Sequence, residues 1–203
     1  MKKQDVMLAK NFKSTFLSCE KDQEEIWKKL FITSKPYSDK LKRLLIVDAK
    51  DCLDMSQYQY TEMINKYDLH DLFEKKYIGN NGFIMLGEHQ ESHSFILLEF
   101  DNFMPSSNEQ YRDCEVGFTI LCNMDYWDLD DYKLRPWEIA GYVDGILSGA
   151  RLSGIGTLHF ISAAQIILPE DNGYGGVRLR YLATHMENSD DSETVVPEWP
   201  AAY

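Results

Sequence analysis

The chain has 203 residues, of which 44% are hydrophobic and 13% are aromatic. This length fits one domain, or one domain with an appended segment, and the composition excludes general disorder. Its 33 acidic and 21 basic residues give a formal net charge of -12. That charge disfavours direct binding to nucleic acid or to anionic membranes, because affinity for phosphates comes from clustered Lys and Arg.

The start of the chain and the cysteines predict a soluble protein of a reducing compartment. The first residues lack the apolar stretch of a signal peptide, and no apolar run approaches the roughly 20 residues of a membrane span. The cysteines at 19, 52, 114 and 122 are widely spaced and form no C-x-x-C pair, which favours intracellular assembly. Cys122 lies on an apolar strand face and is expected to be a buried free thiol.

Residues 1–78 are predicted to be an N-terminal helical region. Two helical pieces are expected within 1–33, and Pro36 ends the second, because the residue before a proline is pushed out of the helical conformation. Residues 39–54 fit either an amphipathic helix or a helix that runs into a strand, since short apolar runs cannot be assigned by periodicity alone. Residues 58–77 have helical spacing.

Residues 79–186 are predicted to form an α+β core, in which a mostly antiparallel sheet of about five strands packs against one central helix. Five runs have strand patterning: 83–86, 94–100, 115–122, 157–168 and 177–184. Apolar residues alternate along 115–122, as in a strand with one buried face. The last two runs flank a Gly-rich turn and predict a long hairpin. Residues 101–110 are expected to be a loop.

The central helix is predicted over residues 135–147. Pro136 suits a first helical turn, where its missing N–H has no intrahelical partner to lose. Four apolar residues then form one stripe that can lie on a sheet: Ile139, Val143, Ile146 and Leu147. Three glycines follow the helix, and we interpret them as helix-end and turn residues: Gly149, Gly154 and Gly156.

The sequence shows no convincing catalytic constellation, so we expect no catalytic residue, no metal, no cofactor and no enzyme activity. His89 and His93 have a spacing that suits a metal on a helix, but the flanking pattern is that of a strand and turn. Glu99, Asp101 and Glu115 lie on or beside adjacent predicted strands. They leave open a less favoured alternative, a nuclease that uses Mg²⁺, although the lysine that usually accompanies such carboxylates is missing.

Two segments have the composition of contact surfaces. The predicted loop 123–133 is dense in Asp, Tyr and Trp, and aromatic residues are a main source of binding energy in interfaces. Residues 187–203 form an acidic spacer and a C-terminal arm with an aromatic end, which either docks on a neighbouring protein or folds back on its own domain. We therefore predict five protein–protein contact residues: Tyr126, Trp127, Tyr132, Trp199 and Tyr203.

The order of the predicted elements resembles a known family. A strand at 114–122, a helix at 135–147, a link at 151–156 and a closing strand at 177–185 follow one another. In this order the chain resembles the tail-terminator or tail-completion proteins of tailed bacteriophages and the related head–tail neck ring proteins, including those of crAss-like phages. The resemblance covers roughly half of the chain, from about residue 82 onward.

The resemblance implies a virion structural protein without enzyme activity. Such a protein is one subunit of a closed homo-oligomeric ring, with a multiple of six copies, around the DNA channel between the capsid portal and the tail. Its partners are portal-side and tail-side virion proteins, no membrane is involved, and DNA passes through the channel without specific binding. The location would be the neck or tail of a virion that is assembled in the host cytoplasm.

Charge alone leaves a second class of function open. An acidic channel wall would repel DNA phosphates and let the genome slide. The same net charge of -12 also suits an acidic adaptor or inhibitor outside virions that mimics DNA and binds a DNA-handling enzyme.

Overall fold

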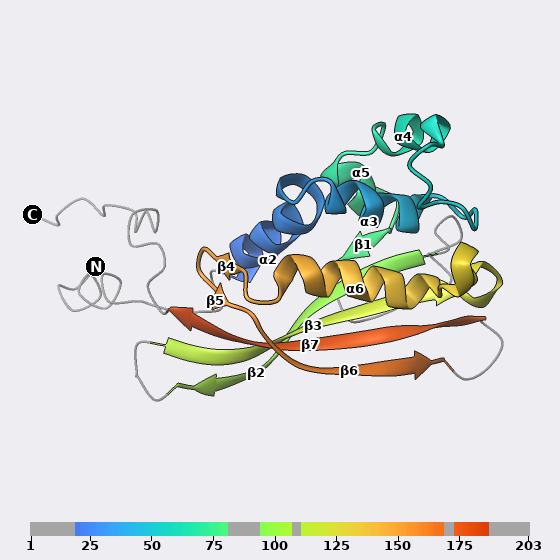
Figure 1. Ribbon diagram of the computed structural model, residues 1–203. Coiled ribbons are helices and arrows are strands. Elements are labelled where there is room, and N and C mark those ends of the chain that lie inside the picture. Colours follow the sequence, from blue (N-terminus) through green and yellow to red (C-terminus); the bar gives the residue numbers. More distant parts are fainter. Residues whose placement is uncertain (1–18, 81–93, 107–110, 169–172, 187–203) are drawn as a thin grey trace, which may run out of the picture.

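The computed structural model describes residues 19–80, 94–106, 111–168 and 173–186, and these form an α+β fold with helices on one face of a sheet (Figure 1). The N-terminal helical elements are α2 (Cys19–Lys28), the π-helical turn η2 (Lys29–Thr33), α3 (Tyr37–Ile46), α4 (Tyr58–Ile64) and α5 (Leu69–Glu74). The longest helix of this set of described residues is α6 (Arg135–Leu147), as the sequence predicts. Two short helical turns precede it, η4 (Met124–Tyr126) and η5 (Asp130–Tyr132).

The main sheet has five strands in the order β1-β2-β3-β7-β6. Their bounds are β1 (Ile78–Gly79), β2 (Ser94–Pro105), β3 (Tyr111–Asn123), β6 (His159–Ile167) and β7 (Tyr174–Met186). β1 runs parallel to β2, and every other pair is antiparallel. A separate small ladder joins β4 (Arg151–Leu152) to β5 (Gly156–Thr157). The mostly antiparallel sheet and the pairing of β6 with β7 confirm the predicted α+β architecture.

Strand β2 is longer than the sequence predicts, because it continues to Pro105. The prediction of a loop that begins at residue 101 is therefore wrong. Between Asp101 and Met104 the register shifts in a β-bulge, and Asn102 takes a positive φ of 51°. The ladder then resumes, with Met104 opposite Asp113. A bulge absorbs the extra residues and lets a polar stretch continue in the sheet. The predicted strand at 83–86 lies outside the described residues.

The core lies between the helices and one face of the sheet. The predicted stripe of α6 is buried, as are Val116, Phe118, Ile120 and Cys122 of β3. Trp27 of α2 is fully buried and packs edge-on against Phe118, with 6.5 Å between ring centroids. The N-terminal helices therefore share one hydrophobic core with the sheet.

Burial keeps the two cysteine thiols on β3 protonated and unreactive. Cys114 and Cys122 are free and fully buried, which confirms the prediction for Cys122. Desolvation raises the pKa of each of these two thiols to about 12, because a thiolate would lose its hydration in the core. Such thiols are poor nucleophiles. Their role is to pack.

Helix α6 is anchored to the sheet and to the N-terminal helices by two polar side chains. The Tyr181 hydroxyl on β7 donates a hydrogen bond of 2.9 Å to Oδ1 of Asp144, and burial raises the pKa of that phenol. Arg135, at the start of the helix, is fully buried. Its guanidinium donates to the carbonyls of Leu44, Val47 and Ala49 at 2.7, 2.7 and 3.0 Å. This arginine ties α6 to the end of α3.

The ambiguous segment 39–54 is a helix followed by a turn. α3 ends at Ile46, and Val47 is already extended, with ψ 112°. The glycines after α6 have positive φ values of 73°, 80° and 75°, which confirms their predicted role at the helix end and in turns. None of the helices in the described part of the chain has the length and apolar character needed to cross a lipid bilayer.

Candidate assembly surfaces

The face of the sheet that points away from the helices is bare: within the described ranges no helix or strand covers it (Figure 1). One end of this bare face is apolar. Phe95 and Leu97 of β2, Leu121 of β3 and Tyr174 of β7 form a second, smaller hydrophobic cluster. The rings of Phe95 and Tyr174 are 5.7 Å apart. These side chains pack against one another, and Ile166 and Leu168 pack against them.

The middle of the bare face carries paired charges. Glu99 of β2 forms an ion pair with Arg178 of β7, and Glu115 of β3 pairs with Arg180 of β7 at 3.1 Å. The amide of Asn102 also donates to Glu115, at 2.9 Å. Glu99 thus meets an arginine two strands away, and Glu115 meets an arginine on the adjacent strand. Arg178 and Arg180 of the bare face are thus each paired with a glutamate.

The three carboxylates that a nuclease would use, Glu99, Asp101 and Glu115, already have other partners. Glu99 and Glu115 bind arginines, which occupy the oxygens that a divalent cation would need. Asp101 bonds the backbone N–H of Asn102 at 2.8 Å. Over the ranges that the structure describes, no three His, Cys, Asp or Glu side chains gather as a metal site. His89 and His93 lie outside those ranges.

A glycine makes possible the ion pair between Glu99 and Arg178, which spans from β2 across β3 to β7. Gly117 of β3 lies opposite Glu99, and a Cβ at this position would be 2.5 Å from Oε1 and 2.7 Å from Cγ of Glu99. The glutamate side chain therefore lies across the backbone of β3 on its way to Arg178. Without a side chain at residue 117, Glu99 on β2 reaches the guanidinium on β7.

We expect Gly117→Ala to displace Glu99 and break its ion pair, with a loss of about 1 kcal/mol in the free energy of unfolding. The loss is small because both side chains are partly exposed, and such pairs contribute little. Urea unfolding measures it. In a Glu99→Ala background the same substitution should cost nothing further, and an equal loss in both backgrounds would refute the role given to Gly117.

Strand β6 is an edge strand with exposed side chains. In the described part of the chain it pairs with β7 alone. Every residue of His159–Ile167 is exposed except Ile166, which is half-buried. Phe160 and Ile167 point to the helix side of the sheet, yet they are 49% and 62% exposed. α6 contacts β3 and β7, and its cover ends before β6 (Figure 1).

The composition of β6 is unusual for an edge. The strand reads His-Phe-Ile-Ser-Ala-Ala-Gln-Ile-Ile and contains no Asp, Glu, Lys, Arg or Pro. Soluble proteins usually protect a long edge strand with charges or prolines, because its open backbone groups can pair with another chain. This edge lacks both forms of protection, in a protein whose charged residues make up 27% of the chain.

The outer face of α6 carries a groove. It has a volume of about 430 Å³, and its walls include Tyr37, Trp137 and Tyr142. Its floor is formed in part by Gly141 and Gly145, and a Cβ at either glycine would meet nothing within 4 Å. The groove is apolar and open to solvent.

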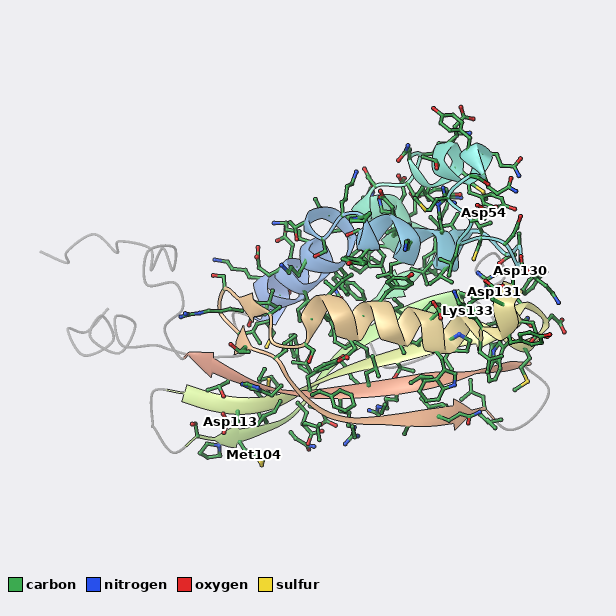
Figure 2. All side chains as sticks on the ribbon, in the orientation of Figure 1. Asp54, Met104, Asp113, Asp130, Asp131 and Lys133 are labelled. Atoms are coloured by element: carbon green, nitrogen blue, oxygen red, sulfur yellow. The ribbon has the colours of Figure 1, made fainter. Side chains whose placement is uncertain are left out.

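The predicted contact residues of the loop differ in exposure. Trp127 is half-buried and donates its indole N–H to the carbonyl of Cys122 at 2.9 Å, so it supports the loop from within. Tyr126 is also half-buried, and its carbonyl accepts from Nε of Arg135 at 2.8 Å. Tyr132 is fully exposed. Figure 2 places its neighbours Asp131 and Lys133 at the end of the molecule where this loop lies.

Two of the five predicted contact residues, Trp199 and Tyr203, lie outside the described residues. The sequence reasoning did not find the bare face, the edge of β6 or the groove on α6. For β6 the available signal was the absence of charge over residues 159–167. That signal alone is equally typical of a buried strand.

Comparisons with known proteins give a family and a distant structural likeness. The fold is similar to a chain of a solved structure titled "Virion of native gene transfer agent (GTA) particle", with 12% identity and a TM-score of 0.39, over 62% of this chain and 90% of that chain. No curated protein matches the sequence. The model of the YomW family, whose name is phage-derived, matches residues 38–183. Because this match runs from α3 through β7 over most of the chain, the protein belongs to the YomW family.

Proposed function

We propose that this protein is a virion structural protein, a subunit of a neck or tail-completion ring that joins the capsid portal to the tail around the DNA channel. The observation that carries the proposal is the edge of β6, where eight of nine residues are exposed and none carries a formal charge. A chain that stays alone in solution would gain nothing from such an edge. Membership of a family with a phage-derived name supports the virion setting.

A closed ring needs two different contact surfaces on each subunit, because its copies meet head to tail. The described residues offer separate surfaces of this kind. The edge of β6 lies at one side of the sheet, and the edge beside β1 lies at the other. Tyr132 projects at one end of the molecule. With Trp199 and Tyr203 of the C-terminal arm, Tyr132 is proposed to contact the portal-side or tail-side neighbours.

The charge of the chain supports passage of DNA without binding. A net charge of -12 gives a ring of many copies a strongly negative field, which repels phosphates. The bare face of the sheet suits contact with protein better than contact with DNA, because Arg178 and Arg180 on it are already paired with glutamates.

Electron microscopy of the purified full-length chain tests this proposal. Rings of uniform diameter with a central channel are the expected result, and the protein should not bind duplex DNA even at low salt. Isolated single subunits that bind tightly to a DNA-handling enzyme, with strong dependence on salt, would favour the acidic adaptor instead.

A further inference from the structure

We infer that, in the unassembled subunit, residues 197–200 of the C-terminal arm dock in the groove on the outer face of α6 of the same chain. The sequence pattern left open whether the arm folds back on its own domain or docks on a neighbour. Three observations favour its own groove: the aromatic lining, the spacing of the prolines in the arm, and the reach of the chain beyond β7. The inference concerns the free subunit and does not depend on the ring, since on assembly the arm would exchange the groove for the neighbours proposed above.

The first observation is the lining of the groove. It contains the aromatic rings of Tyr37, Trp137 and Tyr142, of which Tyr37 is 54% and Trp137 is 44% exposed. Gly141 and Gly145 lie about one helical turn apart in its floor, so the space between the aromatic rings stays open along the helix. Grooves lined by aromatic rings bind proline-rich segments in the polyproline II conformation, which loses little entropy on docking.

The second observation is the sequence of the arm. Residues 197–200 read Pro-Glu-Trp-Pro, which is a P-x-x-P motif. Polyproline II has three residues per turn and rises about 3.1 Å per residue, so Pro197 and Pro200 would share one face and lie about 9 Å apart. The groove extends along α6 from Trp137 to Gly145, which is about 12 Å of helix. The motif therefore matches the groove in length as well as in chemistry.

The charges around the groove allow this match. Nζ of Lys40 lies 5.9 Å from the centre of the Tyr142 ring, at one side of the groove. The motif carries one carboxylate, Glu198, between its two prolines. Because Glu138 also lines the groove, Glu198 is expected to point to the side of Lys40, where the ammonium can neutralise it.

The third observation is the reach of the arm. α6 and β7 end at the same end of the molecule, and β5, which follows α6, contacts β7 there (Figure 1). Residues 187–196 lie between β7 and Pro197, and they span up to about 33 Å when extended. The outer surface of a helix that packs on a sheet is only about 15 Å from that sheet. The arm can therefore reach the groove of its own chain, and the tether gives it a millimolar effective concentration there.

Cross-linking within the full-length chain tests the inference. In a Cys19→Ser background the remaining cysteines are fully buried, so Ala201→Cys marks the arm, Glu138→Cys marks the groove, and a short bismaleimide joins the two thiols. The matched control replaces Glu138→Cys by Ser148→Cys, which is exposed just past α6 at the end of the molecule where β7 ends. Docking predicts a link from position 201 to position 138 that forms about tenfold faster, or more, than the link to position 148, in chains of monomer mass.

Two further changes test the groove and the prolines separately. Gly141→Leu fills the groove at a position where a Cβ meets nothing within 4 Å, so the circular dichroism spectrum should not change. Pro197→Ala together with Pro200→Ala removes the fixed φ values that favour polyproline II. Each change should bring the two cross-linking rates together. Equal rates before these changes, or a preference for position 138 that survives them, would overturn the inference. Links found only in covalent dimers would place the arm on a second copy and overturn its assignment to its own chain.

Discussion

Replacement of Arg135 by alanine is expected to lower the free energy of unfolding by about 3–5 kcal/mol, because several buried carbonyls lose a charged donor at once. The guanidinium is fully buried and donates to the carbonyls of Leu44, Val47, Ala49 and Tyr126. Without it these oxygens face a cavity at the junction of α6, α3 and the loop. Urea denaturation at a fixed protein concentration measures the loss.

Two variants separate the hydrogen bonds of Arg135 from its charge. Arg135→Lys keeps the charge but not the planar fork of donors, so an intermediate loss is expected. Arg151→Ala removes an exposed arginine on β4 and should change stability by less than about 0.5 kcal/mol. If Arg135→Ala were as mild as Arg151→Ala, Arg135 would not be the anchor that we describe.

Gly176→Ala is expected to destabilise the fold by about 3 kcal/mol or more. The added Cβ would clash with backbone atoms, and no movement of a side chain can relieve that clash. A Cβ at this position of β7 would lie 1.8 Å from the carbonyl oxygen of Ile120 on β3. Only a shift of one strand backbone makes room for it, and that shift weakens the ladder at the centre of the sheet. Thermal or urea unfolding detects the change.

The same chemical change on α6 should act in the opposite direction. A Cβ at Gly141 meets nothing within 4 Å, so Gly141→Ala adds helix propensity without a clash. The expected gain is up to about 1 kcal/mol in the free energy of unfolding. Because Gly176→Ala and Gly141→Ala add the same methyl group, the difference between them reports the surroundings of each glycine. Losses of equal size at both positions would contradict the packing described for β7.

The sequence was sufficient for the elements whose pattern is local. Period-two alternation identified β3, and a proline followed by one apolar stripe identified α6. The run of apolar residues at 39–54 was ambiguous because short runs fit helix and strand alike. In the structure its first part belongs to helix α3, which contacts α6 and β2. The extension of β2 was missed because a bulge at Asn102 has no clear signal in a polar stretch.

The candidate surfaces were less accessible to sequence reasoning, since they depend on register. The ion pair of Glu99 with Arg178 joins residues 79 positions apart, and Gly117 between them has meaning only once the strands are aligned. Arg135 bonds carbonyls up to 91 positions away, and arginines are mostly exposed in proteins, so its burial was not predicted. β6 has the composition of a buried strand, and its exposure emerges only from its place at the edge.

The central claim is that copies of this chain close into a ring, and native mass spectrometry of the full-length protein tests it most directly. We predict one closed oligomer of fixed copy number, a multiple of six, at assembly-like concentrations. Removal of residues 187–203 tells whether the C-terminal arm helps to hold the ring, since the oligomer would then be lost on truncation. A full-length chain that remains monomeric, even with portal-side and tail-side rings present, would contradict the account.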